Sequence, residues 1–457
     1  MRMRISFQFF RCPTDAAAAV DRRSRLSNER PVPAESPQHR IFYGWWVLAA
    51  CVVGLAFGYS NAAYLSFGLF VLPLTEAHGW GRGDISVGST IMSLCVAALA
   101  PVAGTLIDRY GPRRVLLPSI VLFSATMAAM WFLTAELWHF YLMCVLIAVT
   151  AVCTAPATYA RVVVNWFDRR RGLALGVALT GIGVGAAIVP PLVQAAVANW
   201  GWRAAYLVLA GCVLATLPVL ALVLRDDPRE MGLAPDNDRS AAAAARKHPS
   251  TIGWLASQAI RRPVFWLMVF SFTIFGAYTL GVVVHLVPLL IDRGLDRSTA
   301  ALAASSLGFA LIAGRLVAGY LLDRLFAPHV VVGVMLAPVM AMAALAMGAS
   351  STPVVFACAI LLGIGLGAEL DFMSYLLSRY FGLRAYAQLY GYMYGVFALG
   401  SAIGPLFMGY VYQSQGTYVP ALWTLCGLTA VALLPFLMLG PYPTLPGAED
   451  SDARKAE

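Results

Sequence analysis

Charged residues are scarce in this sequence, and the cysteines show no spacing typical of a functional or structural site. Only 12% of the 457 residues are Asp, Glu, Lys or Arg, while 60% are hydrophobic. A chain with so little polar surface cannot cover a water-soluble globule, so the composition predicts a membrane protein. The eight cysteines show no metal-binding, redox or disulfide spacing, and all but Cys12 fall in apolar runs, where we expect them to be small buried apolar side chains.

Several catalytic and nucleotide-binding motifs are also missing. The sequence contains no nucleotide-binding loop, no zinc-binding His-Glu pattern, no paired intramembrane Asp motif and no serine or cysteine beside a base. These absences argue against an ATP-driven pump and an intramembrane enzyme, so we expect no enzymatic activity, no cofactor and no metal. The net charge of +9 does not indicate nucleic acid binding, because the basic residues lie in short turns between apolar segments.

Twelve apolar runs follow the first 43 residues. Most are near the ~20 residues that a helix needs to cross about 30 Å of hydrocarbon. A single segment satisfies its own backbone hydrogen bonds in lipid only as a helix, so the runs predict an all-α membrane protein with twelve spanning helices. They cover residues 44–70, 85–107, 115–133, 138–163, 172–196, 203–224, 264–290, 299–322, 329–349, 354–378, 387–412 and 419–440.

The chain repeats itself at a constant shift of 215 positions. Residues 104–114, with the sequence GTLIDRYGPRR, form a compact basic turn between two apolar runs, and residues 319–324 repeat its Gly-x-x-x-Asp-Arg core. Such self-similarity indicates a duplicated unit and predicts two pseudosymmetric six-helix bundles, residues 44–224 and 264–440, joined by a linker, 225–263. The same shift pairs Pro73 with Pro288, Gly79 with Gly294, Arg82 with Arg297, Gly176 with Gly391, Gly185 with Gly400, Pro190 with Pro405 and Gly201 with Gly416.

Lys and Arg are distributed unequally between the two expected faces of the membrane. One face receives most of them, and this asymmetry places both termini in the cytoplasm of a multi-pass plasma (inner) membrane protein. Residues 1–43 carry eight arginines and no apolar core of the signal-peptide kind, so we expect a disordered cytoplasmic tail. Residues 441–457 are expected to form a second cytoplasmic tail, and the protein is expected to be a monomer in the lipid bilayer.

The arrangement of six plus six helices, with a G-x-x-x-D-R-x-G-x-R-R turn after helix 2 and a degenerate copy after helix 8, resembles the major facilitator superfamily. The resemblance spans roughly residues 41–440. Within it, several short segments look like the branch of monocarboxylate transporters and oxalate:formate exchangers. The resemblance implies two bundles around a central cavity, which alternating access opens to one side and then the other. The segments are residues 43–46, 66–70, 166–174, 285–288 and 314–315.

Arg315 is the sharpest candidate for a substrate-binding residue. It lies eight residues before Asp323, about 12 Å along a helix, and therefore near the middle of helix 8. A cation at this depth costs ~2.5 to 3.5 kcal/mol or more and usually faces a cavity or a counter-ion. The planar fork of arginine can hold a carboxylate through two hydrogen bonds, and the resemblance implies this role. The alternative is an internal salt bridge with an acidic residue of helix 10.

The chain also departs from the branch that it resembles. Leu311 stands where animal monocarboxylate transporters often have an aspartate, and Tyr64 stands where they have a lysine in helix 1. Helix 11 lacks the second cation of the oxalate exchangers. A single central cation suits a monoanion better than a dianion, and the missing residues leave the route of proton coupling open.

Glu369 and Asp371 are candidates for proton coupling. Both fall inside helix 10, and at two residues apart they point about 160° to 200° from each other, so we do not expect them to share one site. One of them is expected to take up a proton during transport, because burial favours the neutral form of a carboxylate. The alternative is a structural pair with Arg315, Arg324 or Arg379.

Further side chains are candidates for substrate contact. His285 lies near the outer end of helix 7, where it is expected to relay a proton, to bind substrate or only to pack. The hydroxyl and amide groups of Asn61, Tyr64, Tyr159 and Tyr392 offer donors beside apolar walls, although tyrosines in helices often only pack.

The repeated turn is expected to control conformation. Asp108 can bind the free N–H groups of a neighbouring helix and adjacent arginines, which stabilises the state in which the bundles meet on the cytoplasmic side. The second copy has Phe326 at the glycine position and is expected to hold less firmly. The expected gate residues are Gly104, Asp108, Arg109, Gly111, Arg113, Arg114, Arg161, Asp323 and Arg324.

The sequence thus predicts a secondary transporter for a small organic anion, most simply a monocarboxylate such as lactate or pyruvate, driven by proton symport or exchange. An alternative within the same superfamily is an exporter of amphipathic drugs or metabolites. That alternative predicts that export survives the loss of Arg315.

Overall fold

The computed structural model describes residues 42–237 and 252–446. Most of the two predicted tails and the middle of the linker lie outside the described residues. The described part is helical, and its one bridge of β type joins Gly253 to Gly382.

Seven α-helices and a π-helix, η1, make up the first half. Proline occupies the first turn of α5 and α7, where its missing N–H leaves no hydrogen bond unmade. The elements are α2 (Gly44–Ala56), η1 (Ser60–Leu65), α3 (Phe67–His78), α4 (Arg82–Tyr110), α5 (Pro112–Ala129), α6 (Leu137–Ala151), α7 (Pro156–Trp166) and α8 (Arg171–Val223).

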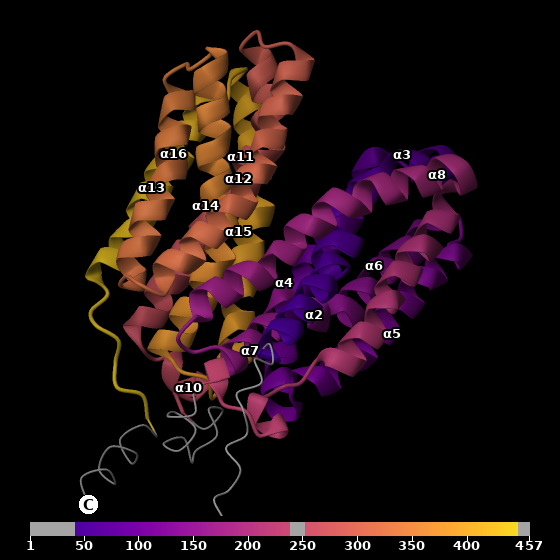
Figure 1. The fold of residues 1–457 in the computed structure, drawn as a ribbon. Coiled ribbons are helices and arrows are strands. Elements are labelled where there is room, and N and C mark those ends of the chain that lie inside the picture. Colours follow the sequence, from indigo (N-terminus) through magenta and orange to yellow (C-terminus); the bar gives the residue numbers. More distant parts are fainter. Residues whose placement is uncertain (1–41, 238–251, 447–457) are drawn as a thin grey trace, which may run out of the picture. The chain divides into compact units, whose positions relative to one another are not determined.

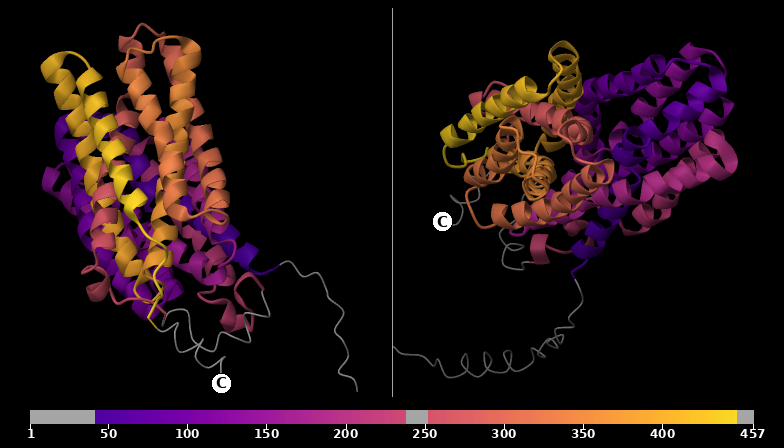
Figure 2. Two further views of the ribbon diagram at one scale, coloured as in Figure 1. Left: turned by 90° about the vertical axis from the view of Figure 1, so that its left-hand side faces the viewer. Right: turned by 90° about the horizontal axis from the view of Figure 1, so that it is seen from above.

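The second half follows the linker and the short helix α10 (Ala256–Ala259). Its helices lie side by side in Figure 1 and in both views of Figure 2, where they are coloured from red through orange to yellow. They are α11 (Pro263–Asp292), α12 (Arg297–Leu322), α13 (Ala327–Ala346), α14 (Thr352–Tyr380), α15 (Tyr386–Gln415) and α16 (Val419–Met438).

Within the described residues, eleven helical segments are long and apolar enough to cross a membrane. One of them, α8, is 53 residues long and has non-helical backbone angles at Gly201, with φ 83° and ψ 169°. Dividing α8 at Gly201 gives twelve spans. The prediction of an all-α membrane protein with twelve spanning helices is therefore confirmed.

Glycines with positive φ end helices at equivalent points of the two halves. Gly79 and Gly294 have φ of 71° and 88°, and Gly201 and Gly416 have φ of 83° and 68°. Side chains with a Cβ atom adopt these angles only at a cost, so the repeated glycines mark repeated turns. The repeat breaks after α12, because Phe326 has φ −65° where Gly111 has φ 88°.

Most of the packing between the first half and the second is made by two pairs of helices, α4 with α15 and α8 with α12. At one pair, a methyl group added to Gly176 would lie 2.7 Å from the carbonyl oxygen of Arg315. At the other, a methyl group on Gly391 would clash with the carbonyl oxygen of Ala100. Gly391 and Arg315 lie 215 positions after Gly176 and Ala100, so the two seams are equivalent under a pseudo-twofold axis. The predicted domain boundaries stay a prediction.

Candidate functional site

Arg315 lies in the second half of α12, seven residues before its last residue, Leu322, and is 3% exposed. Its Nε and Nη1 atoms have no hydrogen-bond partner in the part of the chain that the structure describes. Its backbone carbonyl faces Gly176 of α8, so the residue lies where the two halves meet. A buried guanidinium with free donors inside a membrane-spanning helix requires an anion for compensation.

Helices α12 and α14 run parallel and pack closely beside Arg315. Methyl groups added to Gly363 and Gly367 would clash with the carbonyl oxygens of Leu307 and Leu311, respectively. Gly314, the neighbour of Arg315, faces the backbone of Ile364. Arg315 therefore lies beside the part of α14 that comes about one helical turn before Asp371.

The two acidic residues of α14 have different neighbours. Glu369 is 2% exposed, and its Oε2 accepts a hydrogen bond of 2.7 Å from the hydroxyl of Thr279 in α11. Asp371 is 0% exposed, and neither of its carboxylate oxygens has a hydrogen-bond partner among the described residues. Its charge acts on Tyr390 of α15. The two carboxylates thus face different helices.

Arg315 acts electrostatically on both carboxylates. In the described part of the chain, however, none of its nitrogens lies within the 4.0 Å of either carboxylate that an ion pair requires. A cation and an anion, Arg315 and Asp371, are therefore buried close together without touching. This cluster of Arg315, Glu369 and Asp371 is called the charge cluster below.

Two tyrosines beside the charge cluster were not predicted as site residues. Tyr278 and Tyr390 are both buried, and their hydroxyls have no hydrogen-bond partner among the described residues. The charge of Glu369 acts on Tyr278. Their signal in the sequence was weak, because a tyrosine in an apolar helix looks the same whether it packs or binds.

Three predicted substrate contacts of the first half have neighbours outside this cluster. Asn61 is fully buried in η1, where its amide donates to the carbonyl oxygen of Leu55 over 3.1 Å. Tyr159 is 1% exposed and lies against Gly54 of α2. Tyr64 is half-buried and lies beside the ring of Tyr59, with centroids 6.2 Å apart. Asn61 and Tyr159 are thus packed among helices of their own half.

Two predicted contacts of the second half are also engaged elsewhere. The Nε2 of His285 lies 3.1 Å from the carbonyl oxygen of Pro405, and its Nδ1 lies 3.2 Å from the hydroxyl of Tyr418. The carbonyl can only accept, so Nε2 carries the proton and Nδ1 accepts from Tyr418. Tyr392 packs edge-on against Phe265, with ring centroids 6.5 Å apart. A role of either residue in substrate binding stays a prediction.

Asp108 joins the two halves at one end of α4. Its carboxylate accepts hydrogen bonds from the backbone N–H groups of Ala387 and Gln388, at 3.2 and 2.9 Å, in the first turn of α15. The Nε of Arg161 lies 3.6 Å from the same carboxylate, and its Nη1 donates to the carbonyl oxygen of Leu383. Arg161 therefore reaches from α7 into the other half, and its role in gating stays a prediction.

Asp323 makes the equivalent contact 215 positions later. It accepts hydrogen bonds from the N–H groups of Gly172 and Leu173, at 2.6 and 2.9 Å, in the first turn of α8. These bonds are no longer than those of Asp108, although the second copy of the turn has lost its glycine. Burial raises the pKa of the Asp323 carboxyl, and the two N–H groups oppose that rise. Asp323 forms no ion pair in the described residues, whereas Asp108 has Arg161.

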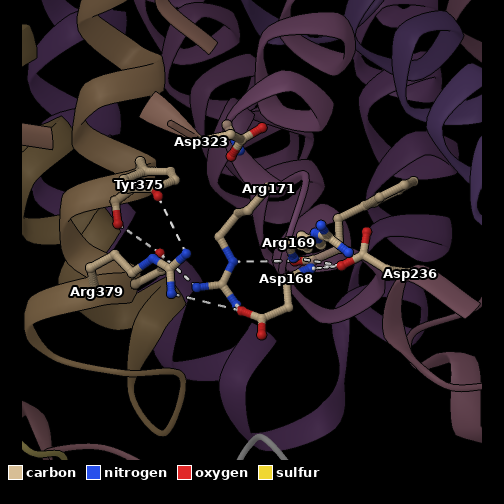
Figure 3. A network of polar contacts seen from close by, with 10 residues as sticks. Asp168, Arg169, Arg171, Asp236, Asp323, Tyr375 and Arg379 are labelled. Carbon is tan, nitrogen blue, oxygen red and sulfur yellow. Dashed lines mark hydrogen bonds and ion pairs between the residues drawn. The ribbon is translucent and has the colours of Figure 1, made fainter. Parts of the chain in front are cut away.

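Figure 3 shows a polar network beside the Asp323 contact that the sequence did not reveal. The side chain of Arg171 donates to Asp168 over 2.9 Å and, across the two halves, to the hydroxyl of Ser378 over 3.1 Å. Arg379 lies 3.9 Å from Asp168 and donates to the hydroxyl of Tyr375. The sequence offered Arg379 as a possible partner of Glu369 or Asp371, whereas in the described residues its ion pair is with Asp168.

The other predicted gate arginines stay within their own half. The backbone N–H of Arg113 donates to Asp226 over 2.8 Å, and its guanidinium donates to the carbonyl oxygen of Ala221. Arg109 and Arg324 lie over the rings of Tyr110 and Tyr320. Gly111, next to Asp226, ends α4, and Arg114 acts electrostatically on Asp226. A role of these residues in gating stays a prediction.

The arrangement closes one end of the pair of bundles. Both aspartate contacts and the Arg171 network lie at the end of the molecule that carries Asp108 and Asp323, called the Asp108 end below. The two glycine seams lie further from that end, and one of them includes Arg315 of the charge cluster. Separation of the two halves at the Asp108 end would break the aspartate contacts and the Arg171 network together.

Comparison with known proteins places this geometry in context. A family model described as Major Facilitator Superfamily matches residues 46–368 and 289–456. Monocarboxylate transporter 11 of Homo sapiens is 28% identical over 404 residues, which cover 85% of this chain and 80% of that protein. The uncharacterized MFS-type transporter YcxA of Bacillus subtilis is 26% identical over 295 residues, covering 64% of this chain and 68% of its own length.

Two solved structures share the fold at low identity. The proton:xylose symporter XylE has a TM-score of 0.71 and 12% identity, covering 88% of this chain and 96% of that chain. The fucose:proton symporter FucP of E. coli has a TM-score of 0.64 and 16% identity, covering 86% and 98%. The relatives are transporters and not enzymes, as the sequence predicted.

Proposed function

The chain belongs to the major facilitator superfamily and is a multi-pass membrane transporter of a small molecule, and from this premise we propose that it carries a small organic monocarboxylate. The observation that supports the proposal is the buried guanidinium of Arg315, whose Nε and Nη1 have no partner among the described residues. Two parallel N–H groups of a guanidinium match the two oxygens of a carboxylate. The proposed role of Arg315 is to hold the substrate carboxylate through such a pair.

Alternating access follows from the placement of Arg315 at the seam of the two halves. In the proposed cycle, substrate reaches Arg315 from the side opposite the Asp108 end. The halves then separate at the Asp108 end. This separation breaks the hydrogen bonds that Asp108 and Asp323 accept from the opposite half, and the substrate is released at that end. With both termini in the cytoplasm of the plasma membrane, as proposed from the charge distribution, the Asp108 end faces the cytoplasm.

Coupling to protons or to a second anion is the remaining part of the proposal. Glu369 is buried beside Arg315 and held by the hydroxyl of Thr279. Protonation of this carboxylate would remove one negative charge from the charge cluster when an anionic substrate arrives. Proton symport and exchange of two anions both avoid adding a net negative charge to the buried site.

The proposal is tested by uptake into proteoliposomes across a panel of labelled monocarboxylates, with and without an imposed pH gradient. Wild type is expected to accumulate at least one of them, and Arg315→Gln is expected to lose that uptake. Arg315→Lys keeps the charge but not the planar fork and should retain only part of it. Equal uptake by all three proteins would remove the basis of the proposal and favour the amphipathic exporter.

A further inference from the structure

The charge cluster holds more negative than positive groups. Within the described residues it combines one guanidinium, Arg315, with two carboxylates, Glu369 and Asp371, all at most 3% exposed. Even with Glu369 protonated, as proposed above, a simple monoanion bound to Arg315 would bring a second negative charge next to the carboxylate of Asp371. Like charges in a buried site repel strongly, so the cluster as it stands favours a ligand that also carries a positive charge.

Asp371 is the carboxylate that lacks compensation. Glu369 has the hydroxyl of Thr279 as a donor. Both oxygens of Asp371 are buried and have no donor within the described part of the chain, while Arg315 stays outside ion-pair distance. A buried carboxylate without a donor is costly, and natural proteins tolerate one mainly at functional sites.

Arg315 and Asp371 also have the right relative position for one ligand. They lie on two neighbouring parallel helices, about one helical turn apart, close enough for Arg315 to act electrostatically on Asp371 but outside ion-pair distance. Arg315 offers free N–H donors, and Asp371 offers free acceptor oxygens. A ligand with a carboxylate and a cationic donor on adjacent carbon atoms can satisfy both groups at once.

We propose that the substrate is a zwitterion, a small carboxylic acid whose carboxylate pairs with Arg315 and whose ammonium group pairs with Asp371. This inference rests on the proposed function and names the substrate class within it: amino acids rather than simple or hydroxy acids. Binding such a ligand leaves the net charge of the cluster unchanged. Asp371 is then the residue that distinguishes an ammonium group from a hydroxyl.

The test uses pairs of substrates that differ only in this group. Lactate and alanine share a three-carbon skeleton, as 3-phenyllactate and phenylalanine share a larger one, with a hydroxyl in the first member and an ammonium in the second. Uptake of all four labelled compounds into proteoliposomes is measured with wild type, Asp371→Asn and Glu369→Gln. In wild type, the ammonium member of a pair is expected to have the higher kcat/KM.

The variants separate recognition from general effects on transport. Asp371→Asn should lower kcat/KM for the ammonium member by about 10- to 100-fold, as expected for loss of a charge-assisted hydrogen bond, and change the hydroxyl member much less. Asp371→Glu keeps the charge and should retain part of the preference. Glu369→Gln, the matched control two residues away, should change both members of a pair by the same factor. Uptake of the hydroxyl member by Asp371→Asn also shows that this variant folds.

Three outcomes overturn the inference, and they differ in what they leave standing. If wild type transports a hydroxy acid and the matching amino acid neither enters nor competes, the zwitterion is excluded and the proposed function remains. If Asp371→Asn lowers both members of a pair equally, Asp371 does not recognise the ammonium group. If no monocarboxylate of either kind is transported, the proposed function fails together with the inference.

Discussion

At the scale of single residues, Asp108 and Asp323 tie the two halves of the chain together through backbone N–H groups. Each accepts two hydrogen bonds from the first turn of a helix in the opposite half. A hydrogen bond to a charged group is worth about 1.5 to 3 kcal/mol, and the positive end of a helix macrodipole adds to it. Two side chains thus contribute a large part of the attraction between the halves at this end. The hydrogen bonds of both aspartates break when the halves separate.

Replacement of Asp108 by asparagine should weaken closure at the Asp108 end. The variant keeps the size of the side chain but loses the charge that interacts with Arg161 and with the first turn of α15. Spin labels on the exposed, equivalent positions Tyr110 and Leu325 should report a larger population of long distances. Asp84→Asn, at the other end of α4, is the control and should leave the distances unchanged. An unaltered distribution in Asp108→Asn would contradict the proposed role.

Asp226 should make stability depend on pH. Burial raises its pKa to about 6, although the N–H of Arg113 and nearby arginines oppose the rise. Because the folded pKa lies above the unfolded value, the contribution to stability is complete below the unfolded pKa and is lost as the pH rises through about 6. Melting temperatures of wild type should fall from pH 4 to pH 7 more than those of Asp226→Asn. Parallel curves for the two proteins would show that this carboxyl does not contribute.

At the scale of helices, glycines set how closely the two halves approach. Gly391 of α15 faces the backbone of Ala100 in α4, and Gly176 of α8 faces that of Arg315 in α12. Since backbone meets backbone at both seams, no rotamer change can accommodate an added side chain. An added methyl group at Gly391 or Gly176 should therefore destabilise the state in which the two halves are in contact at these seams.

Gly391→Ala is expected to favour opening at the Asp108 end. The added methyl group would clash with the carbonyl oxygen of Ala100. Gly211→Ala in the second part of α8 is the matched control, because a methyl group there meets no atom within 4 Å. The control should be neutral or slightly stabilising, since alanine favours helix over glycine by about 1 kcal/mol. Solvent accessibility of a cysteine at Leu389, which is 1% exposed, should increase only in Gly391→Ala.

The linker is tied to the loop between α14 and α15. The N–H of Trp254 donates to Phe381, and the N–H of Leu383 donates to Ile252, each over 2.9 Å. Arg161 of the first half donates to the carbonyl oxygen of the same Leu383. The backbone pairing between the linker and residues 381–383 thus fixes the loop to which Arg161 donates its hydrogen bond when the Asp108 end is closed.

Gly382→Ala should release this pairing. Its φ is 78°, and the new methyl group would lie 2.6 Å from the Cα of Gly253. Gly232→Ala is the control in the same linker, because its φ is 69° and the methyl group meets no atom within 4 Å. Hydrogen exchange at the amides of Trp254 and Leu383 should become faster in Gly382→Ala and not in the control. Equal exchange in both variants would show that the clash is absorbed elsewhere.

At the scale of the whole molecule, the shift of 215 positions relates contacts as well as residues. Asp108 binds the N–H groups of Ala387 and Gln388, and Asp323 binds those of Gly172 and Leu173. Each partner in the second half lies 215 positions after its counterpart in the first. Trp166 and Asn165 donate to the chain after α8, and Tyr380, the counterpart of Asn165, donates in the same way to Gly440 after α16. The duplication thus preserves two kinds of contact in both halves. One is the aspartate that binds backbone N–H groups of the opposite half, and the other is the side chain that binds the segment after the last helix of its own half.

Much of this architecture could be predicted from the sequence, because it depends on local properties. Apolar runs, the repeat and positive-φ glycines such as Gly201 define the spans and the turns. The site could be predicted only in part, because it depends on which faces of distant helices meet. Arg315 could be identified from its position inside a predicted membrane-spanning helix. Tyr390 and Arg171 could not, because their neighbours come from distant parts of the sequence. His285 and Asn61 were plausible binding residues by chemistry. Both ring nitrogens of His285 have partners, and the amide nitrogen of Asn61 donates to Leu55, which leaves only the Asn61 Oδ1 without a partner among the described residues.

The most direct test of the central claim is binding of a labelled carboxylate to the purified transporter. The uptake panel selects the compound, and its Kd is measured for wild type and for Arg315→Gln. Loss of the charge-assisted bonds to the carboxylate predicts a Kd at least about 10-fold higher in the variant, with the same melting temperature within a few degrees. Equal Kd values for the two proteins would contradict the claim that Arg315 holds the substrate.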